Sequence, residues 1–195
     1  MILSDASMLR CNVVPEAAFG NVASKLSFLK GVHMAQMTDP HNGLVSFQAA
    51  LLGGHIQPRV CSKHQDLSFL YDIAETSPRM TYALVDSKNA VKALASFVPV
   101  EPCNGSPCFG VGYAVAESFR GQGLAHEILE KSLDEFVALS KGKTPRMYIE
   151  AVVGADNFAS QKVAGRFIND APDEITDNIS GLPALHYMRL IECGV

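Results

Sequence analysis

The sequence has little charge, and its basic residues are spread along the chain. Only 18% of the 195 residues are charged while 48% are hydrophobic, so the chain can form a substantial core and is not disordered. Sixteen Lys and Arg residues stand against 20 Asp and Glu, which gives a net charge of −4. Because a nucleic-acid-binding surface needs clustered basic residues, this pattern excludes nucleic acid as the partner.

Long apolar runs and paired cysteines are also missing. The longest apolar stretch without a charged residue, residues 41–58, is broken by polar side chains well short of the ~20 residues that span a bilayer. Asp5 stands where a signal peptide would have its apolar centre. The five cysteines are scattered, with no CxxC pair to bind zinc. We therefore predict a cytoplasmic protein with no membrane contact and no metal site.

Apolar spacing and turn residues predict an α/β fold in one domain, residues 1–195, because no Pro-, Ser- or Gly-rich linker divides the chain. The expected helices cover residues 15–30, 44–52, 67–74, 124–141 and 158–167. The expected strands cover residues 8–14, 80–86, 90–100, 108–116, 147–153 and 184–191. The turn composition of residues 86–89 and 101–107 makes the strands between residues 80 and 116 an antiparallel meander.

The most regular predicted helix begins at Leu124. Its apolar residues repeat with helical spacing, and its charged residues, Glu135 among them, fall mostly on the other face. The helix joins strands 108–116 and 147–153 into a βαβ unit, in which the two strands should be parallel. Ligands of such sheets bind beyond the carboxyl ends of the strands, which here means residues 117–125 and 154–160.

The loop between this strand and this helix, residues 118–125, has the composition of an anion site. A helix N-terminus offers unpaired amides and the positive end of the helix dipole. Gly121 and Gly123 have no Cβ to hold a phosphate away from the amides, and Arg120 adds positive charge. The loop lacks the Lys-Ser/Thr of a Walker A sequence and the spacing of a dinucleotide motif. A tight turn that simply needs its glycines is the alternative.

Two segments at the right separation resemble one family. Arg-x-x-Gly-x-Ala at 120–125, after the strand at 111–117, resembles the acyl-CoA pyrophosphate loop of the GNAT superfamily of N-acetyltransferases. Residues 149–160, with Asn157-x-x-Ser160-x-x-Val163, resemble the next strand and helix start, in the branch that includes ribosomal-protein N-terminal acetyltransferases.

The resemblance implies a GNAT-like mixed, mostly antiparallel central sheet with one parallel βαβ pair and helices on both faces. It extends well over residues 80–167. Residues 80–195 would form the cofactor-binding core, and residues 1–79 an N-terminal part on the acceptor side.

The resemblance also implies where acetyl-CoA would bind, with coenzyme A as the product. The pyrophosphate would be held by Arg120, Gly121, Gln122, Gly123, Leu124 and Ala125. In the family the preceding strand diverges from its parallel neighbour and pairs with the pantetheine arm, a role that falls here on Ala114 and Val115. The Val115 N–H would face the thioester oxygen as a one-donor oxyanion hole. Asn157 and Ser160 match positions that contact the cofactor, and Asn157 also suits a helix N-cap.

Two carboxylates are candidates for the catalytic base. An ammonium group with a pKa of ~10 must lose its proton before attack, and a carboxylate usually takes it. Glu150 interrupts an apolar strand beside the expected cleft and matches a position where many relatives carry Glu; a solvent-facing role is its alternative. Glu117, at the end of the other strand, is the second candidate.

The general acid is not assigned by the resemblance. Many relatives have a tyrosine seven residues after the Asn, and this chain has Ala164 there. Tyr187, Tyr113 or solvent could protonate the leaving thiolate instead. Cys108 is expected to be a small buried side chain and not a nucleophile.

We therefore predict an N-acetyltransferase that moves the acetyl group of acetyl-CoA to a primary amine, of a small molecule or a peptide, by direct attack in a ternary complex. The alternative is a non-catalytic acyl-CoA-binding sensor or regulatory protein with the same fold, for which the absence of a tyrosine at position 164 is the best argument. The identity of the amine and the oligomeric state stay open, with a homodimer as one option.

Overall fold

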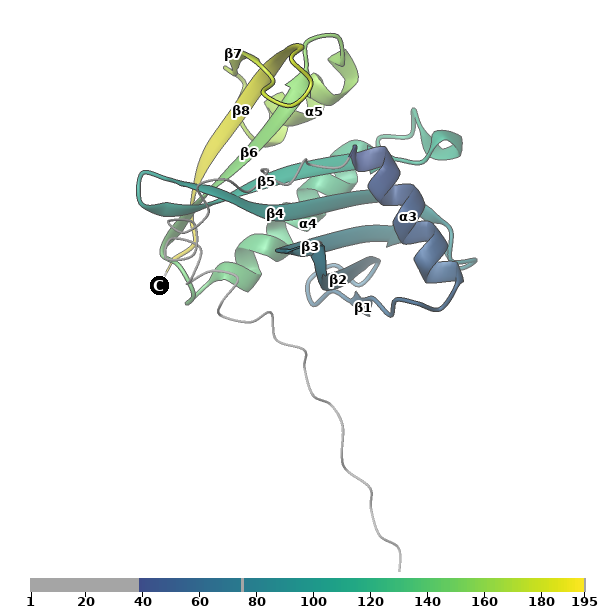
Figure 1. Cartoon of the computed structure of the whole chain (residues 1–195). Helices are drawn as coiled ribbons and strands as arrows, with labels where there is room; N and C mark the ends of the chain where they lie inside the picture. The colour runs from purple at the N-terminus through teal and green to yellow at the C-terminus, as the bar shows by residue number, and fades with distance from the viewer. Residues whose placement is uncertain (1–38, 75, 195) are drawn as a thin grey trace, which may run out of the picture.

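An eight-stranded sheet forms the centre of the computed structural model, which describes residues 39–74 and 76–194. The strands lie in the order β1-β2-β3-β4-β5-β6-β8-β7 (Figure 1). They are β1 (Arg59–Val60), β2 (Leu67–Ala74), β3 (Ser77–Val85), β4 (Val91–Cys103), β5 (Ser106–Val115), β6 (Arg146–Gly154), β7 (Asp173–Thr176) and β8 (Pro183–Glu192). All neighbours are antiparallel except β5 and β6, which confirms the predicted mixed sheet with one parallel pair.

Within the described residues, three α-helices cover the sheet, one on its first face and two on its second (Figure 1). They are α3 (Pro40–Leu52), α4 (Leu124–Ser140) and α5 (Phe158–Phe167), and a short 3₁₀ helix, η1 (Glu117–Phe119), follows β5. We call the first face the α3 face and the second the α4 face. On the α3 face, Leu44 and Phe47 pack on Ala83, Val91 and Leu94. Helices therefore lie on both faces, as predicted.

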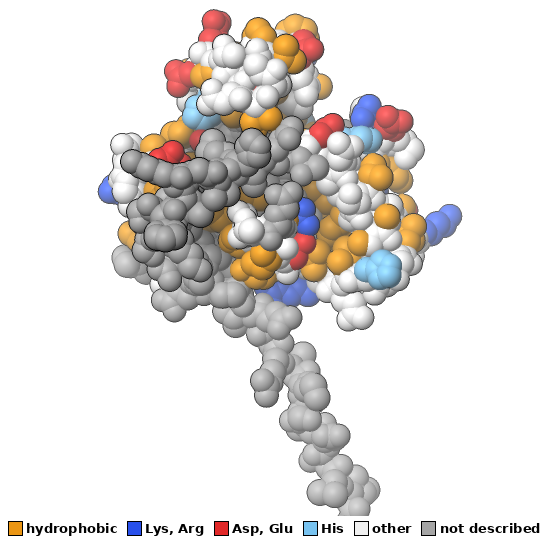
Figure 2. Space-filling model, viewed as in Figure 1, with side chains coloured by type: hydrophobic (Ala, Val, Ile, Leu, Met, Phe, Trp, Pro, Cys, Tyr) orange, Lys and Arg blue, Asp and Glu red, His pale blue; other side chains and the backbone are white. Residues whose placement is uncertain are grey.

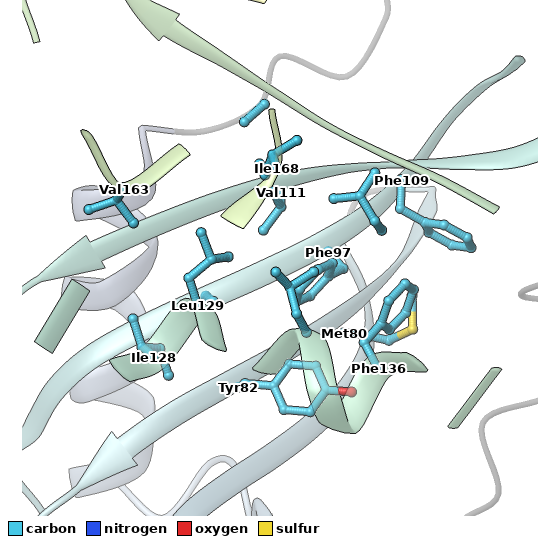
Figure 3. Close-up of a cluster of buried hydrophobic side chains, with 14 of the residues drawn as sticks. Met80, Tyr82, Phe97, Phe109, Val111, Ile128, Leu129, Phe136, Val163 and Ile168 are labelled. Carbon is cyan, nitrogen blue, oxygen red and sulfur yellow. The ribbon is translucent and has the colours of Figure 1, made fainter. Parts of the chain in front are cut away.

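The core between the sheet and α4 is the larger of two apolar clusters. Phe97, Phe109 and Phe136 lie at its centre, with the Phe97 and Phe136 rings stacked at 4.6 Å and Phe109 edge-on to Phe136 at 4.9 Å (Figure 3). Each of these side chains is fully buried, and burial of such a ring stabilises the fold by roughly 1.5–3 kcal/mol. The cluster fixes α4, and therefore the loop before it, against the sheet.

One predicted helix is wrong. Residues 67–74 form strand β2, in which Leu67 and Phe69 are buried and Ser68 and Leu70 less so. Leu67, Phe69, Tyr71 and Ile73 alternate with period two, and a run of eight residues is too short for its apolar content to distinguish a helix from a strand. The short strands β1 and β7 were not predicted. The predicted strand at 8–14 and helix at 15–30 lie outside the described residues.

The predicted turns are present, although the second is tighter than expected. In the β3–β4 turn, Asp86 Oδ1 accepts hydrogen bonds from the N–H groups of Lys88 (2.8 Å) and Ala90 (2.9 Å). The β4–β5 turn consists of Asn104 and Gly105, both with positive φ, so the two strands extend further than residues 100 and 108. At its other end, β5 reaches the edge of the sheet at which η1 and then α4 follow.

The α3 face carries side chains of every class in its described part (Figure 2). Lysine and arginine side chains are visible there at separate points, not as a stripe. Among the described residues, no helix combines the length and the apolar character needed to cross a membrane.

Candidate functional site

The two parallel strands β5 and β6 diverge after a short paired segment. They pair only where residues 108–110 face residues 148–150. Beyond this point β5 pairs only with β4, and β6 only with β8, so residues 111–115 and 151–154 face each other across an opening between the strands (Figure 1). Backbone groups on these two inner edges lack ladder partners, and buried polar groups need one. The opening therefore suits a ligand that can form hydrogen bonds to extended backbone.

The alternation of β5 determines which backbone groups face the opening. The Ala116 N–H donates to the Lys92 carbonyl of β4 at 3.0 Å. Ala114 has the same orientation as Ala116, while Val115 and Tyr113 turn their backbone groups towards the inner edge. The Ala114 methyl group packs on the α3 face instead. Of the two strand residues predicted to contact the cofactor, only Val115 therefore presents its backbone to the opening.

The loop after β5 ends in a set of free amides. Gly121 and Gly123 have φ angles of +76° and +77°, which glycine adopts without strain. In the described part of the chain, the N–H groups of residues 121–125 donate to no acceptor, while the Gly123 carbonyl accepts from His126 N–H at 3.0 Å and starts α4. These amides lie at the positive end of the α4 dipole. The predicted loop thus has the geometry of an anion site, and a pyrophosphate fits its chemistry.

Arg120 and Glu117 both lie at this loop. Arg120 is exposed, and its Nε donates to the Val115 carbonyl at 3.4 Å. Glu117 is exposed on η1, and its carbonyl accepts from the Arg120 N–H at 3.2 Å. From Gly110 to Val115 alone, β5 spans roughly 17 Å. Because Gly110 is the partner of Glu150 in the register, the two candidate bases are not brought together, and Glu117 lies beside the proposed phosphate position.

The same distance separates Val115 from Glu150. The Val115 N–H, the predicted oxyanion donor, therefore lies well along β5 from the register position of Glu150, the predicted base. Tyr113 turns its N–H to the same inner edge and lies roughly 10 Å from Gly110 along β5. The sequence motif alone could not decide between these two amides, because the point at which the strands separate is a property of the pairing.

Asn157 and Ser160 link α5 to the opening. Asn157 Oδ1 accepts from the Ser160 N–H at 3.1 Å, which confirms Asn157 as the N-cap of α5. The Ser160 carbonyl accepts from the Tyr113 hydroxyl at 2.7 Å, so a hydrogen bond joins β5 to the helix that follows β6. Burial raises the pKa of Tyr113, which keeps this phenol protonated and able to donate. This contact gave no signal in the sequence.

Glu150 lies at the point where the strands separate. Its neighbours Ile149 and Ala151 are buried under α4, so Glu150 points to the α3 face, where its side chain is 23% exposed. Its carboxylate Oε2 is 3.1 Å from Nε2 of His186, a residue of β8 that the sequence had not drawn attention to. Glu150 is therefore partly buried and has a defined partner, and the solvent-facing alternative does not describe it.

Cys108 is buried beside Glu150. Burial, and next the nearby Glu150 carboxylate, raise the pKa of its thiol to about 12. The thiol is therefore protonated at neutral pH and is not an effective nucleophile, which agrees with its predicted role as a small buried side chain. Ala164 is fully buried, and burial raises the pKa of Tyr187. In residues 39–74 and 76–194, no three His, Cys, Asp or Glu side chains are placed to hold a metal ion.

Comparisons with known proteins identify a family for this chain. Residues 54–167 match the model of the acetyltransferase (GNAT) domain family. No curated protein matches the sequence. Among solved structures, the ribosomal-protein alpha-N-acetyltransferase RimL in complex with coenzyme A is 26% identical over 59% of this chain, with a TM-score of 0.45. The match covers 63% of the RimL chain, which is less than two thirds of its length.

A further solved structure that matches is a chimera of the spermidine N-acetyltransferase SpeG from Vibrio cholerae. It is 14% identical over 57% of this chain and 69% of its own, with a TM-score of 0.42.

Proposed function

The chain belongs to the acetyltransferase (GNAT) domain family, and we propose that it transfers the acetyl group of acetyl-CoA to a primary amine by direct attack. The observation that carries this proposal is the continuous backbone surface formed by the inner edge of β5 and the free amides of residues 121–125. A ligand that is extended at one end and anionic at the other matches this surface. Acetyl-CoA has both features and supplies an activated thioester.

In this proposal the loop amides and Arg120 hold the pyrophosphate, and Val115 pairs with the pantetheine arm through its backbone. Asn157 and Ser160 flank the arm from the side of α5. The Tyr113 N–H, nearer to Glu150 along β5, polarises the thioester carbonyl as the oxyanion donor. Each of these contacts except that of Arg120 is made by backbone or by a helix cap, so the cofactor would be bound without a cluster of basic side chains.

Glu150 is the proposed base. Its carboxylate takes one proton from the acceptor ammonium, directly or through a water molecule. The neutral amine then attacks the carbonyl carbon, the new N–C bond forms, the C–S bond breaks, and coenzyme A leaves as a thiolate. One of the two protons then on the nitrogen passes through solvent to the thiolate, which leaves an amide with one N–H. The raised pKa of Cys108 supports direct attack, because the thiol nearest Glu150 is protonated and poorly nucleophilic.

A non-catalytic acyl-CoA sensor is the second candidate. Ala164, fully buried where many relatives carry a tyrosine, is the observation that favours it. The two candidates share the cofactor site and differ only in turnover.

Thiol release from acetyl-CoA, measured across a panel of peptides, polyamines and amino acids, tests the proposal. We expect release that depends on one class of amine, and Glu150→Gln should lower kcat by about 10²- to 10⁴-fold without changing the affinity for acetyl-CoA. Glu101→Gln, an exposed residue of β4, is the matched control and should leave kcat unchanged. Tight acetyl-CoA binding with no release for any amine would instead identify a sensor, and an active Glu150→Gln enzyme would remove Glu150 as the base.

A further inference from the structure

Glu150 and His186 form a pair across two neighbouring strands. The pair lies on the α3 face, with Nε2 and Oε2 3.1 Å apart and the two side chains 22% and 23% exposed. In the register of β6 and β8, Glu150 faces Met188 and Val152 faces His186. His186 is therefore the diagonal neighbour of Glu150, displaced along β6 towards the end where β5 and β6 are apart.

The chemistry of the pair fixes the direction of its hydrogen bond. An ionised carboxylate can only accept, so Nε2 must carry the hydrogen and donate it to Oε2. Oε1 of Glu150 is then the oxygen that the imidazole does not hold. The imidazole thereby determines which oxygen is available.

The neighbours of Glu150 differ on its two sides. On the β8 side, Met188 faces Glu150 and lies 3.9 Å from Cys103, measured between Sδ and Sγ. On the β5 side, the facing residue Gly110 contributes no side chain, and the Cys108 thiol of the same strand lies next to the carboxylate. The proposed thioester would lie on this β5 side, where Cys108 is the neighbouring side chain.

Glu150 also differs from other paired carboxylates in the described part of the chain, because its partner is a histidine alone. Asp72, Asp66 and Asp134 each bind a lysine or an arginine. Within residues 39–74 and 76–194, Glu150 pairs with His186 and with no lysine or arginine. A permanent cation favours the ionised form of a carboxylate much more than a neutral donor does. Glu150 is thus held in place without losing its ability to accept a proton.

We propose that His186 is a positioning residue for the acetyl-transfer base: it holds Oε2 of Glu150 through Nε2–H so that Oε1 faces the acceptor amine. The inference rests on the proposed role of Glu150 as the base. It adds a residue from the closing strand β8 to a site otherwise built from β5, β6, α4 and α5.

The test compares His186→Phe, which removes the donor, with His186→Gln, whose side-chain amide can still donate. His64 offers a matched control, because its Nε2 lies 2.8 Å from Asp134 of α4, on the face of the sheet opposite to Glu150, with similar partial exposure. We expect His186→Phe to lower kcat about 10- to 100-fold with an unchanged KM for acetyl-CoA. His186→Gln should recover most of the rate, and His64→Phe should retain all of it.

The rate–pH profile provides a readout that a purely structural role would not change. Without the donor, the ionised form of Glu150 is less favoured, so the acid limb of the profile should move to higher pH in His186→Phe. Other groups also face this pair: Asp173 of β7 faces His186 in the register, and the Cys108 thiol of β5 lies near Glu150. Asp173→Asn is therefore measured in parallel and should leave the shift caused by His186→Phe intact.

The outcomes separate this inference from the proposed function. If Glu150→Gln is inactive but His186→Phe keeps the wild-type rate and rate–pH profile, the positioning role of His186 is wrong. The proposed role of Glu150 as the base is then retained. An unshifted profile in His186→Phe, with a loss of rate that His186→Gln does not restore, would also overturn the positioning role in favour of a structural one. If Glu150→Gln keeps its activity, the proposed base itself fails. Thermal unfolding of each variant shows whether any loss of rate reflects loss of the fold.

Discussion

Two glycines at opposite ends of α4 separate backbone strain from ligand binding. Gly123 and Gly142 have φ angles of +77° and +71°, and both have open space where a Cβ would lie. A side chain at either position costs about 1–2 kcal/mol because of its left-handed backbone. Only Gly123 lies among the free amides of the proposed phosphate loop, so the two positions form a matched pair.

We expect Gly123→Trp to weaken acetyl-CoA binding by at least about 100-fold, because the indole would cover the amides of residues 121–125. Gly142→Trp should lower the thermal stability about as much as Gly123→Trp does. It should bind acetyl-CoA with the wild-type affinity. Calorimetric titration with acetyl-CoA measures both affinities. Equal affinities in the two variants would show that the loop is not the phosphate site.

At the residue scale, the sequence could indicate features whose signal is local. Gly121 and Gly123 lie within three residues of the start of α4, so one short segment was enough to predict a glycine turn before this helix. His186 is 36 residues from Glu150, and their contact depends on the pairing of β6 with β8. No local pattern could have indicated that pair.

At the scale of elements, α4 is held to the start of the sheet by a buried carboxylate. Glu135 was expected on the polar face of the helix, but it is only 6% exposed. Its carboxylate accepts hydrogen bonds from the N–H groups of Lys63 (2.6 Å) and His64 (2.7 Å) and from the Ser62 hydroxyl (3.2 Å). The segment between β1 and β2 therefore covers the side of α4 that amphipathic spacing had assigned to solvent.

Glu135→Ala should lower the free energy of unfolding by about 3 kcal/mol, because it leaves the two backbone amides without their charged acceptor. Glu130→Ala, an exposed position of the same helix, should change it by less than about 0.5 kcal/mol. Urea unfolding of both variants provides the comparison. A Glu135→Ala value as small as that of Glu130→Ala would mean that these hydrogen bonds contribute little in solution.

Elements with long periodic patterns could be predicted, and short ones could not. Residues 124–140 contain several helical turns of consistent spacing, and α4 has the predicted start. The eight residues of β2 contain too few repeats to distinguish the helical period of about 3.6 residues from the strand period of about 2, and β1 has only two residues. The burial of Glu135 was missed because the segment that covers it lies more than 70 residues earlier in the chain.

At the scale of the whole molecule, ion pairs between residues 63–66 and α4 connect stability to pH. Lys63 pairs with Asp134, and Lys131 pairs with Asp66. The Lys63 and His64 side chains hold the pKa of Asp134 below its usual range, and Lys131 does the same for the pKa of Asp66. Because the folded pKa values lie below the unfolded value of ~3.9, the stabilisation is complete above that pH and is lost as pH falls through the folded values.

Asp134→Asn should therefore be less stable than the wild type at about pH 6 and equally stable at about pH 2. The difference at the higher pH should stay below about 1 kcal/mol, because the Asp134 side chain is 41% exposed and solvent screens the pair. Calorimetric melting across this range measures it. Asp170→Asn, at an exposed position, is the control, and a pH-independent difference for Asp134→Asn would contradict the assignment.

The overall fold class was predictable because the βαβ unit and the hairpins are each encoded in adjacent segments. The pattern of strands, turns and one long helix between residues 80 and 153 predicted the mixed sheet. It also predicted the edge of the sheet at which the loop of residues 118–125 lies. The length over which β5 and β6 stay paired depends on packing across the whole sheet. For that reason the positions of Val115 and Tyr113 relative to Glu150 could be compared only in the structure.

The divergence of β5 and β6 also affects how freely this protein can change in evolution. The hydrogen-bonding groups that face the opening are backbone N–H and C=O groups of residues 111–115 and 151–154. Any side chain compatible with a strand therefore preserves them. Residue type is constrained chiefly at Gly121 and Gly123, where the backbone is left-handed. Mutations can therefore accumulate along these strand edges without loss of the backbone groups that face the opening.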